Sequence, residues 1–421
     1  MQKMKYSGVE WIGEIPEDWE ITTYRRLLNR RKEYDDQDKQ VLSLTIQGVK
    51  VKNENYGKMA EDFTGHQIVK QGDLVFTPRD FDATPILSGI APCDGCISNL
   101  YFVLYPHNIS ETFIPFINYF MWGVKWGGDI WKRLSYGMRF SYNFQQFGAL
   151  PIAVPPIDTQ RRIADFLDDK CGKIDRYIEK QQQIIDKLKE YKQAVITETV
   201  TKGLDPDVPM KDSGIEWIGM IPEHWDIPEI KYLVRIASGG TPDRNHPEYW
   251  NGNIPWIKTG ELQNDIITNA EEYITEEGLN NSSAQVFNIN TILVAMYGQG
   301  KTRGMTALLK TPASTNQACA GLTVTNSNVQ IEYLWQCLIG AYDAIRSEAA
   351  GSGQPNLSAT LIGSFHIALP PIEEQGLIVE YIKDRTVEIK STIHKAEKLL
   401  EKLTEYKKSL IYEAVTGKME V

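Results

Sequence analysis

The chain has 421 residues, of which 42% are hydrophobic and 24% are charged, and its formal net charge is −10. This composition is typical of a globular, soluble chain of two or three domains. Five cysteines do not suggest a disulfide framework, and no apolar run is long enough to span a membrane, so we expect a cytoplasmic protein. The net charge also argues against a broad basic face for nucleic acid.

The chain begins with a segment that it later repeats. Residues 7–21 return as residues 213–227 with 11 of 15 positions identical, at a constant offset of 206. Each copy carries two Trp residues around an Ile-Pro turn, which favours a packing role over base stacking. A period of this length indicates a duplicated domain pair rather than a solenoid. We therefore predict an N-terminal collar over 1–21 and a repeat collar over 203–227.

Each collar is followed by a body in which short apolar runs alternate with turn residues. We predict the first body over 22–157 and the second over 228–371. Both are predicted to be mixed α/β domains. The predicted strands are 41–46, 72–76, 100–105, 292–297 and 318–324, and the predicted helices are 114–122 and 331–345.

A Pro-Pro-Ile sequence at 155–157 and again at 370–372 ends each body and opens a long helical run. Proline is tolerated at a helix entry, so we predict long helices over 158–202 and 372–417. Both carry an apolar seam at a spacing of 3.5 residues, which is typical of a coiled coil. The main seam residues are Ile174, Ile178, Leu188, Ile389, Ile393 and Leu403. Two long helices packed for stability alone would fit the seam equally well.

This arrangement resembles the specificity subunit of type I restriction-modification systems. The resemblance covers essentially the whole chain and includes the collar repeat. Three further stretches support it, namely Ser-Gly-Gly-Thr-Pro-Asp-Arg at 238–244, Ile-Pro-Trp-Ile-Lys-Thr-Gly-Glu-Leu at 254–262 and Ser-Thr-Asn-Gln-Ala at 314–318. In the first body, Asp-Gly-Cys-Ile-Ser-Asn-Leu-Tyr at 94–101 is similar to another family segment.

The resemblance implies an α+β protein with two target recognition domains, separated by two long helices that form an antiparallel intramolecular coiled coil with pseudo-twofold duplication. It implies that each body reads part of an asymmetric, bipartite double-stranded DNA target. Two methyltransferase subunits and restriction-translocase subunits would complete the complex. The resemblance further implies that S-adenosylmethionine, ATP and Mg²⁺ are used only in those partners, so that this chain binds no cofactor.

Candidate DNA contacts are polar or basic residues in the loops of the two bodies. Arginine, lysine and side-chain amides are the groups that read base edges or hold phosphates. The candidates are Arg79, Ser98, Asn99, Arg139, Asn143, Thr241, Arg244, Lys258, Tyr297, Lys301, Arg303, Asn316 and Gln317. A solvated basic turn for residues 297–303 and strand-edge capping for Asn316 and Gln317 are open alternatives.

Two other motifs suggest different chemistry. The sequence Gly300-Lys301-Thr302 after an apolar run imitates a phosphate-binding loop, but the residues that follow predict a strand rather than the required helix. Cys93 and Cys96 look like half of a zinc site, but the sequence has no second close pair. We therefore expect no metal site.

Catalytic motifs are missing from the sequence. Neither Pro-Pro pair is preceded by Asn or Asp and followed by an aromatic residue, as an adenine methyltransferase would require, and we find no nucleophile elbow or nuclease core. We therefore expect a non-enzymatic recognition subunit. Two alternatives remain, a coiled-coil scaffold with two ligand-binding domains that bridges protein partners, and a nucleotide hydrolase that rests on Gly300-Lys301-Thr302 alone.

Overall fold

The structure is a computed structural model that describes most of the chain. The described residues are 3–34, 40–52, 65–81, 85–137, 140–298, 300–351 and 356–421. They form two compact units, residues 1–182 with 397–421 and residues 183–396. Within the described residues, no helix combines the length and the apolar character that a membrane span requires.

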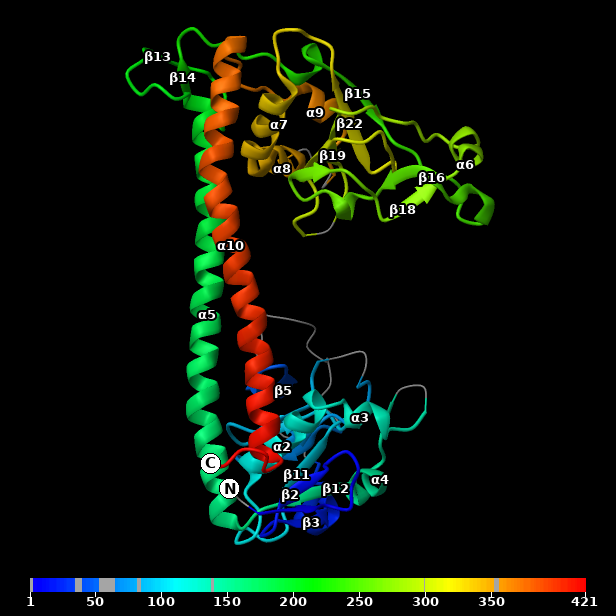
Figure 1. Cartoon of the computed structure of the whole chain (residues 1–421), viewed down its shortest axis with the longest axis vertical. Helices are drawn as coiled ribbons and strands as arrows, with labels where there is room; N and C mark the ends of the chain where they lie inside the picture. The colour runs from blue at the N-terminus through cyan, green and yellow to red at the C-terminus, as the bar shows by residue number, and fades with distance from the viewer. Residues whose placement is uncertain are drawn as a thin grey trace. The chain divides into compact units, whose positions relative to one another are not determined.

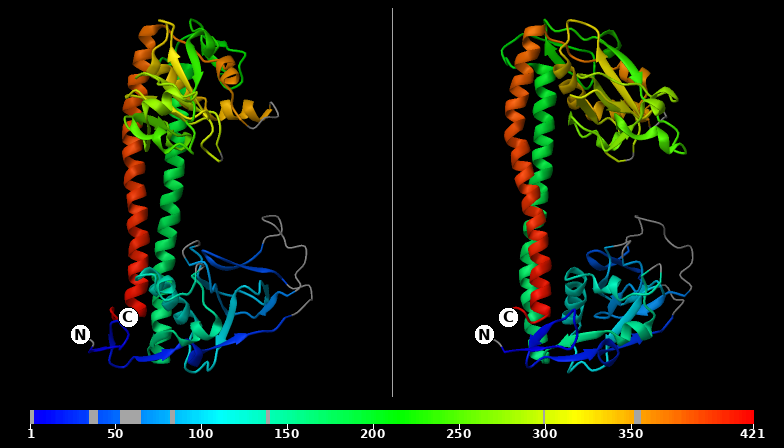
Figure 2. Two further views of the ribbon diagram at one scale, coloured as in Figure 1. Left: turned by 90° about the vertical axis from the view of Figure 1, so that its right-hand side faces the viewer. Right: turned by 45° about the vertical axis from the view of Figure 1, so that its right-hand side comes forward.

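Two long helices run through both units. Helix α5 spans Ile157–Lys202 and helix α10 spans Ile372–Val415, close to the predicted limits. In the first unit, Ile163 and Leu167 near the start of α5 share a core with Ile411 and Ala414 near the end of α10. In the second unit, the end of α5 shares a core with the start of α10. The helices therefore pair in antiparallel fashion within each unit, as Figures 1 and 2 show.

The predicted seam forms the buried stripe of this pair. Ile174, Ile389 and Ile393 are buried, and Ile178, Leu188 and Leu403 are half-buried. Their alternation with exposed residues follows the 3.5-residue spacing that predicted a coiled coil. Lys407, which interrupts the seam in the first unit, donates two hydrogen bonds of 2.7 Å to the Asp175 carboxylate on α5.

The body of the first unit is built on a four-stranded antiparallel sheet in the order β4–β11–β8–β9. Two hairpin-like pairs lie beside it, and β3 pairs with β12 next to the collar. The strands are β3 Glu20–Thr23, β4 Leu28–Arg31, β5 Leu42–Thr45, β6 Gly48–Val51, β7 Gln67–Val69, β8 Leu74–Phe76, β9 Ser88–Ile90, β10 Gly95–Ile97, β11 Phe102–Pro106 and β12 Pro151–Val154. The helices are α1 Tyr24–Leu27, α2 Ile114–Trp126, α3 Ile130–Arg133 and α4 Phe144–Ala149.

The body of the second unit has a five-stranded sheet in the order β15–β22–β19–β20–β17, and a three-stranded sheet in the order β18–β16–β21. The strands are β15 Val234–Ser238, β16 Trp250–Ile257, β17 Asp265–Ile267, β18 Glu272–Ile274, β19 Ile292–Ala295, β20 Thr306–Leu309, β21 Ser314–Thr315 and β22 Cys319–Val324. The helices are η1 Ile230–Tyr232, η2 Pro247–Tyr249, η3 Thr259–Glu261, α6 Glu276–Asn280, α7 Ile331–Gly340, α8 Tyr342–Gly351 and α9 Ala359–Ser364.

Four strands of the two main sheets correspond in order and register, and the second sheet adds β17 beside β20. Leu74 of β8 lies opposite Leu104 of β11, and Ile292 of β19 lies opposite Leu322 of β22. On the outer side, Arg30 of β4 lies opposite Leu104, and Ile236 of β15 lies opposite Leu322. Residues of the two bodies can therefore be paired one by one, although their sequences differ.

One predicted helix is wrong. The run 331–345 was expected as a single helix, but α7 ends at Gly340 and α8 begins at Tyr342. The carbonyl oxygen of Gly340 accepts hydrogen bonds from Gln193 and Thr197 of α5, and a Cβ on Gly340 would lie 3.1 Å from the Val200 side chain. This close contact with α5 interrupts the helix.

The collars cover the ends of the helix pair. In the first collar, β1 (Met4–Tyr6) pairs with β2 (Glu14–Pro16), and in the second, β13 (Met210–Asp212) pairs with β14 (Met220–Pro222). Trp19 and Trp225 are buried. Trp225 packs close to Gly203 just after α5, and Trp19 packs close to Gly417 just after α10. The two ends of the chain thus lie together in the first unit (Figure 2), and the tryptophans have the expected packing role.

A buried glutamine ties each body to the start of its helix. In the first unit, Gln160 accepts a hydrogen bond from the Phe113 N–H and donates to the carbonyl oxygens of Glu111 and Pro155. In the second unit, Gln375 accepts from the Gln330 N–H and donates to Asn328 and Pro370 in the same way. Both glutamines are almost fully buried, and their bonds to the carbonyl oxygens of Pro155 and Pro370 are buried as well.

We predict that Gln160→Ala destabilises the first unit. The change leaves a backbone N–H and two carbonyl groups without their partner, and each buried polar group left unpaired costs about 1–3 kcal/mol. Calorimetry of the full chain should show a lowered melting temperature. The matched control is Gln183→Ala, at an exposed position of the same helix. Equal melting temperatures for the two variants would contradict the role of Gln160.

Candidate nucleic-acid interface

Two loops in each body gather most of the predicted DNA-contacting residues. The first, which we call the hairpin loop, connects β8 to β9 in the first body and β19 to β20 in the second. Arg79 lies five residues after Leu74, and Tyr297 lies five residues after Ile292, so the paired register makes these two positions equivalent. Lys301 and Arg303 belong to the same loop of the second body. The structure therefore places the Arg79 and Tyr297 candidates at one topological position.

The second loop, which we call the entry loop, precedes β11 in the first body and β22 in the second. Ser98 and Asn99 stand at the same distance before Leu104 as Asn316 and Gln317 stand before Leu322. The Ser98 carbonyl accepts a hydrogen bond from Gln67, and Asn316 Oδ1 accepts from the Ala318 N–H. For the Asn316 oxygen, the capping alternative is thus the one that the structure shows.

A third segment meets the hairpin loop in both bodies. The Tyr142 N–H donates to the Pro78 carbonyl, and the Leu357 N–H donates to the Met296 carbonyl. The next residue caps a short helix each time, because the Asn143 side chain accepts from the Gln146 N–H and the Ser358 side chain accepts from the Leu361 N–H. Arg139 lies outside the described residues.

In the first body these three segments line a cleft of about 570 Å³. It brings together three of the predicted contacts, namely Arg79, Asn99 and Asn143. Ser98 does not line it. The rest of the wall is formed by residues that the sequence analysis did not select, namely Arg30, Pro78, Leu100, Phe102, Tyr136, Ser141, Tyr142, Phe144 and Gln146.

In the second body, Arg244, Lys258 and Asn316 line a separate cleft of about 570 Å³. Arg244 stacks on Trp250, 3.6 Å from its ring centroid, and forms an ion pair with Glu272. Lys258 also forms an ion pair with Glu272, and these contacts hold the pKa of the Glu272 carboxyl below its usual value. Both cations are therefore already paired with acids of this surface.

Thr241 connects this region to the entry loop, since its hydroxyl donates a hydrogen bond to the Gln317 side chain. Because the Gln317 oxygen is engaged in this way, the amide nitrogen is the group left to contact a base acceptor. The structure thus brings Thr241 and Gln317 together, and Arg244, Lys258 and Asn316 together.

Helix α8 holds the hairpin loop of the second body. Arg346 donates hydrogen bonds of 2.7 and 2.8 Å to the carbonyl oxygens of Arg303 and Gly300, and the Tyr342 hydroxyl donates to the Lys301 carbonyl. Gly300 has a φ of +60°, a conformation that glycine adopts without strain. Among the described loop residues, the Tyr297 and Lys301 side chains are exposed and Arg303 is half-buried.

The hairpin loop is not a phosphate-binding loop. The residues after Lys301 turn back and form β20, antiparallel to β19, where a phosphate-binding loop would open a helix. The prediction of a strand here is confirmed, and the nucleotide-hydrolase alternative loses its structural basis.

The half zinc site gains no support from the structure. Cys96 is buried in β10, and Cys93 is half-buried and near enough to Gln40 for a weak hydrogen bond. Within the part of the chain that the structure describes, no group of three or more His, Cys, Asp or Glu side chains is placed to hold a metal ion.

Sequence reasoning missed Arg30, which lines the cleft of the first body, and Arg346, which holds the hairpin loop of the second body. Arg30 lies in a short strand, and Arg346 lies on a helix far along the chain from the loop that it holds. The repeat carries one signal for Arg30, because the equivalent residue of the second body is the apolar Ile236. The sequence carries no comparable signal for Arg346.

Part of the chain matches a known protein family. Residues 222–402 match the type I restriction modification DNA specificity domain. The type I restriction enzyme MjaIX specificity subunit of Methanocaldococcus jannaschii is 31% identical over 195 residues, which cover 44% of this chain and 43% of that protein. This match therefore spans less than half of that relative's length.

Two further matches extend over nearly the whole chain. The putative type I restriction enzyme MjaX specificity subunit of the same organism is 25% identical over 97% of this chain and 96% of its own length. A solved structure from work on complex assembly and conformational transition of the type I restriction-modification system shares the fold, with a TM-score of 0.68. The two chains are 13% identical, and the match covers 96% of this chain and 99% of that chain. The chain is therefore similar in sequence to a type I restriction enzyme specificity subunit over nearly its whole length, and its residues 222–402 match the DNA specificity domain.

Proposed function

We propose that this chain is the DNA sequence-specificity subunit of a type I restriction-modification complex. It is a non-catalytic subunit that reads an asymmetric, bipartite target and directs adenine methylation and restriction by its partners. One observation carries this proposal. The same sheet presents a hairpin loop and an entry loop in both bodies, and those loops hold different candidate DNA-contacting side chains in each.

The chemical difference between the equivalent loops supports an asymmetric target. Arg79 in the first body corresponds to Tyr297 in the second, and Asn99 corresponds to Gln317. Arginine pairs best with guanine and side-chain amides with adenine in the major groove, whereas tyrosine offers a ring and one hydroxyl. Two readers on one scaffold with different side chains would recognise two different half-sites.

Partner subunits are expected to hold most of the DNA backbone. The chain carries a net charge of −10, and two of its candidate cations, Arg244 and Lys258, are already paired with acids. Strong binding to DNA needs many uncompensated phosphate contacts. We assign those contacts, and the flipping of the target adenine, to two methyltransferase subunits that use S-adenosylmethionine. Restriction-translocase subunits would use ATP and Mg²⁺, and the complex would act in the cytoplasm.

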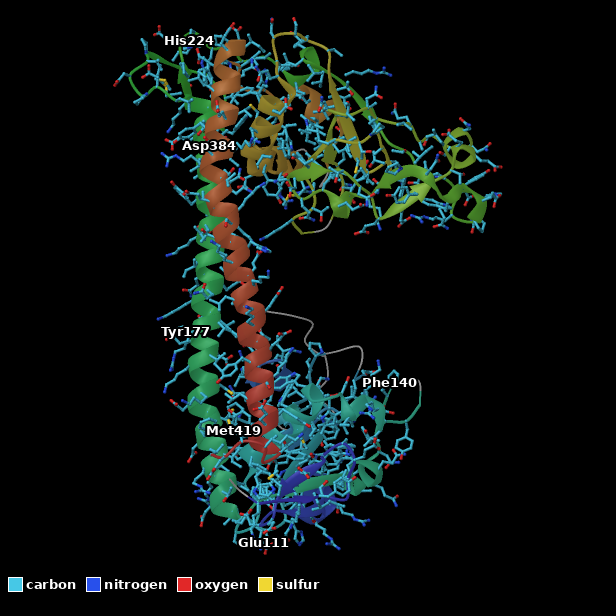
Figure 3. The ribbon with its side chains drawn as sticks, in the orientation of Figure 1. Glu111, Phe140, Tyr177, His224, Asp384 and Met419 are labelled. Carbon is cyan, nitrogen blue, oxygen red and sulfur yellow. The ribbon has the colours of Figure 1, made fainter. Side chains whose placement is uncertain are left out.

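The outer faces of the long helices offer a surface for the methyltransferase subunits. Tyr177, Ile184 and Tyr191 recur every seven residues on α5, and all three are exposed. On α10, Leu399 and Tyr406 repeat the last two positions. Figure 3 shows Tyr177 on the side of α5 that faces away from α10. Exposed apolar residues at coiled-coil spacing are typical of a surface that packs against another helix.

We predict that exchanging residues 228–365 for the same region of a relative changes one half of the methylated sequence and leaves the other half unchanged. The reason is that each body carries its own hairpin and entry loops. The measurement is sequencing of methylated sites in DNA modified by the reconstituted complex. A change in both halves, or in neither, would contradict the assignment of one half-site to each body.

We predict that Arg346→Ala weakens discrimination in one half-site only, by roughly tenfold, since a good base contact contributes about 1–3 kcal/mol and the loop that carries it loses two hydrogen bonds. Methylation rates on targets with single substitutions in each half-site would measure this. Arg235→Ala, at an exposed position of β15, serves as the matched control. If Arg346→Ala lowered methylation equally on all targets, a role in positioning the loop would be disproved.

We predict that Ile184→Glu lowers the affinity for the methyltransferase subunit by about tenfold or more, because it places a charge in the middle of the apolar stripe. Gln183→Glu, at an exposed position about 100° round the helix from Ile184, introduces the same residue outside the stripe and should bind almost normally. Binding can be followed by titration with the purified partner. Equal affinities for both variants would show that the stripe is not the docking surface.

A further inference from the structure

Arg30 occupies an unusual position in the cleft of the first body. Its guanidinium lies 4.5 Å from the centroid of the Phe102 ring and 5.8 Å from that of Phe144, so the planar group rests against two aromatic side chains. Its Nε atom is buried and has no hydrogen-bond partner among the described residues. Its terminal nitrogens are not among the buried unpaired atoms, so they remain accessible to a ligand. The guanidinium is thus fixed in place while its donors are unused.

The surroundings of Arg30 leave its charge uncompensated. Among the residues that the structure describes, the cleft is lined by two guanidinium groups, those of Arg30 and Arg79, and by no carboxylate. Desolvation by burial lowers the pKa of Arg30, which shows that its environment disfavours the cation, although an arginine remains charged at neutral pH. An acceptor-rich ligand would supply the missing partner.

The second body shows that the fold does not require this arginine. Ile236 stands at the equivalent position of β15, where it packs on the apolar core of that body and lies near Gly363 of α9. Gly148 of α4 corresponds to Gly363, at the same distance from the start of its helix. An aliphatic side chain therefore satisfies the same structural position, and the charge of Arg30 is left without a structural explanation.

We propose that Arg30, supported by Arg79, reads a guanine in the half-site recognised by the first body. This inference rests on the proposed function and names the ligand of one part of its site. The accessible terminal nitrogens of Arg30 form the fork that would donate to the O6 and N7 atoms of guanine. Arg79 and Asn99 lie on the opposite loops of the cleft, where they would contact the neighbouring acceptor groups.

A guanine edge fits the cleft better than a phosphate does. Its volume of about 570 Å³ exceeds that of a phosphate group, and its wall carries the side-chain amides of Asn99, Asn143 and Gln146 beside the two arginines. An arginine fork also pairs with phosphate, so the fork alone does not select the ligand. The recessed position of Arg30 against aromatic rings, and the three side-chain amides that line the same cleft, favour the edge of a base pair, which presents several donors and acceptors in one plane.

The test uses the full chain with its methyltransferase partner and a library of randomised DNA, from which the methylated sequences are read. Two variants are compared, Arg30→Ile, which copies the second body, and Arg30→Lys, which keeps the charge but loses the fork. We expect both to lower the preference for guanine at one position of one half-site by about 10- to 100-fold. The other half-site should keep its preference unchanged.

Two outcomes would overturn the inference. A uniform loss with Arg30→Ile that Arg30→Lys restores would make Arg30 a phosphate contact, and unchanged preferences would make it structural. A loss of preference at both half-sites would indicate misfolding. Melting temperatures detect misfolding independently, with Arg162→Ile at an exposed position of α5 as the reference variant. If the unmutated complex methylates no bipartite sequence at all, the proposed function fails. If the unmutated complex methylates a bipartite sequence and the Arg30 variants keep the same base preferences, the guanine inference alone fails.

Discussion

The antiparallel pairing of α5 with α10 is the constraint on which the rest of the structure depends. Each unit completes its core with one stretch of each helix, so neither body could bury its apolar residues without the pair. Helix α2 of the first body packs so closely on α10 that a Cβ on Gly123 would lie 2.7 Å from Val415. In the second unit, a Cβ on Gly340 of α7 would lie 3.1 Å from the Val200 side chain of α5. Gln160 and Gln375 then fix each body to its own helix start by equivalent hydrogen bonds.

A lysine interrupts the apolar seam in each unit, Lys407 in the first and Lys192 in the second, but the two lysines have different charged neighbours. Lys407 has a carboxylate partner, Asp175, on the opposite helix. Lys192, its counterpart in the repeat, is half-buried, and desolvation together with the nearby Lys390 lowers the pKa of its ammonium group. The position equivalent to Asp175 is occupied by Lys390. Duplication has therefore kept the helix packing while allowing the charges, like those of the loops, to diverge.

Much of this fold could be predicted from the sequence, because its strongest signals are local or periodic. The seam at Ile174, Ile389 and Ile393 and the repeated collars are visible in one reading of the chain. The break between α7 and α8 could not be predicted, because it depends on hydrogen bonds from side chains of α5, which lies far away in the sequence. The loop candidates were found by residue type, but their equivalence became visible only through the strand register.

The candidate site was harder to predict for the same reason. Nothing near Arg244 in the sequence indicates that Glu272 pairs with it, and nothing near Lys301 indicates that Arg346 holds its loop. Such contacts join segments far apart in the chain, and only the fold brings them together. Arg30 shows the converse, because this arginine was visible in the sequence but acquired meaning only beside Phe102, Arg79 and its counterpart Ile236.

The most direct test of the account is to sequence the methylated sites in DNA modified by this chain together with its methyltransferase partner. Two different readers on one repeated scaffold predict a single motif with two unlike halves and a spacer of fixed length. A palindromic motif, a single continuous half-site, or methylation without sequence preference would contradict the claim that the two bodies read DNA separately.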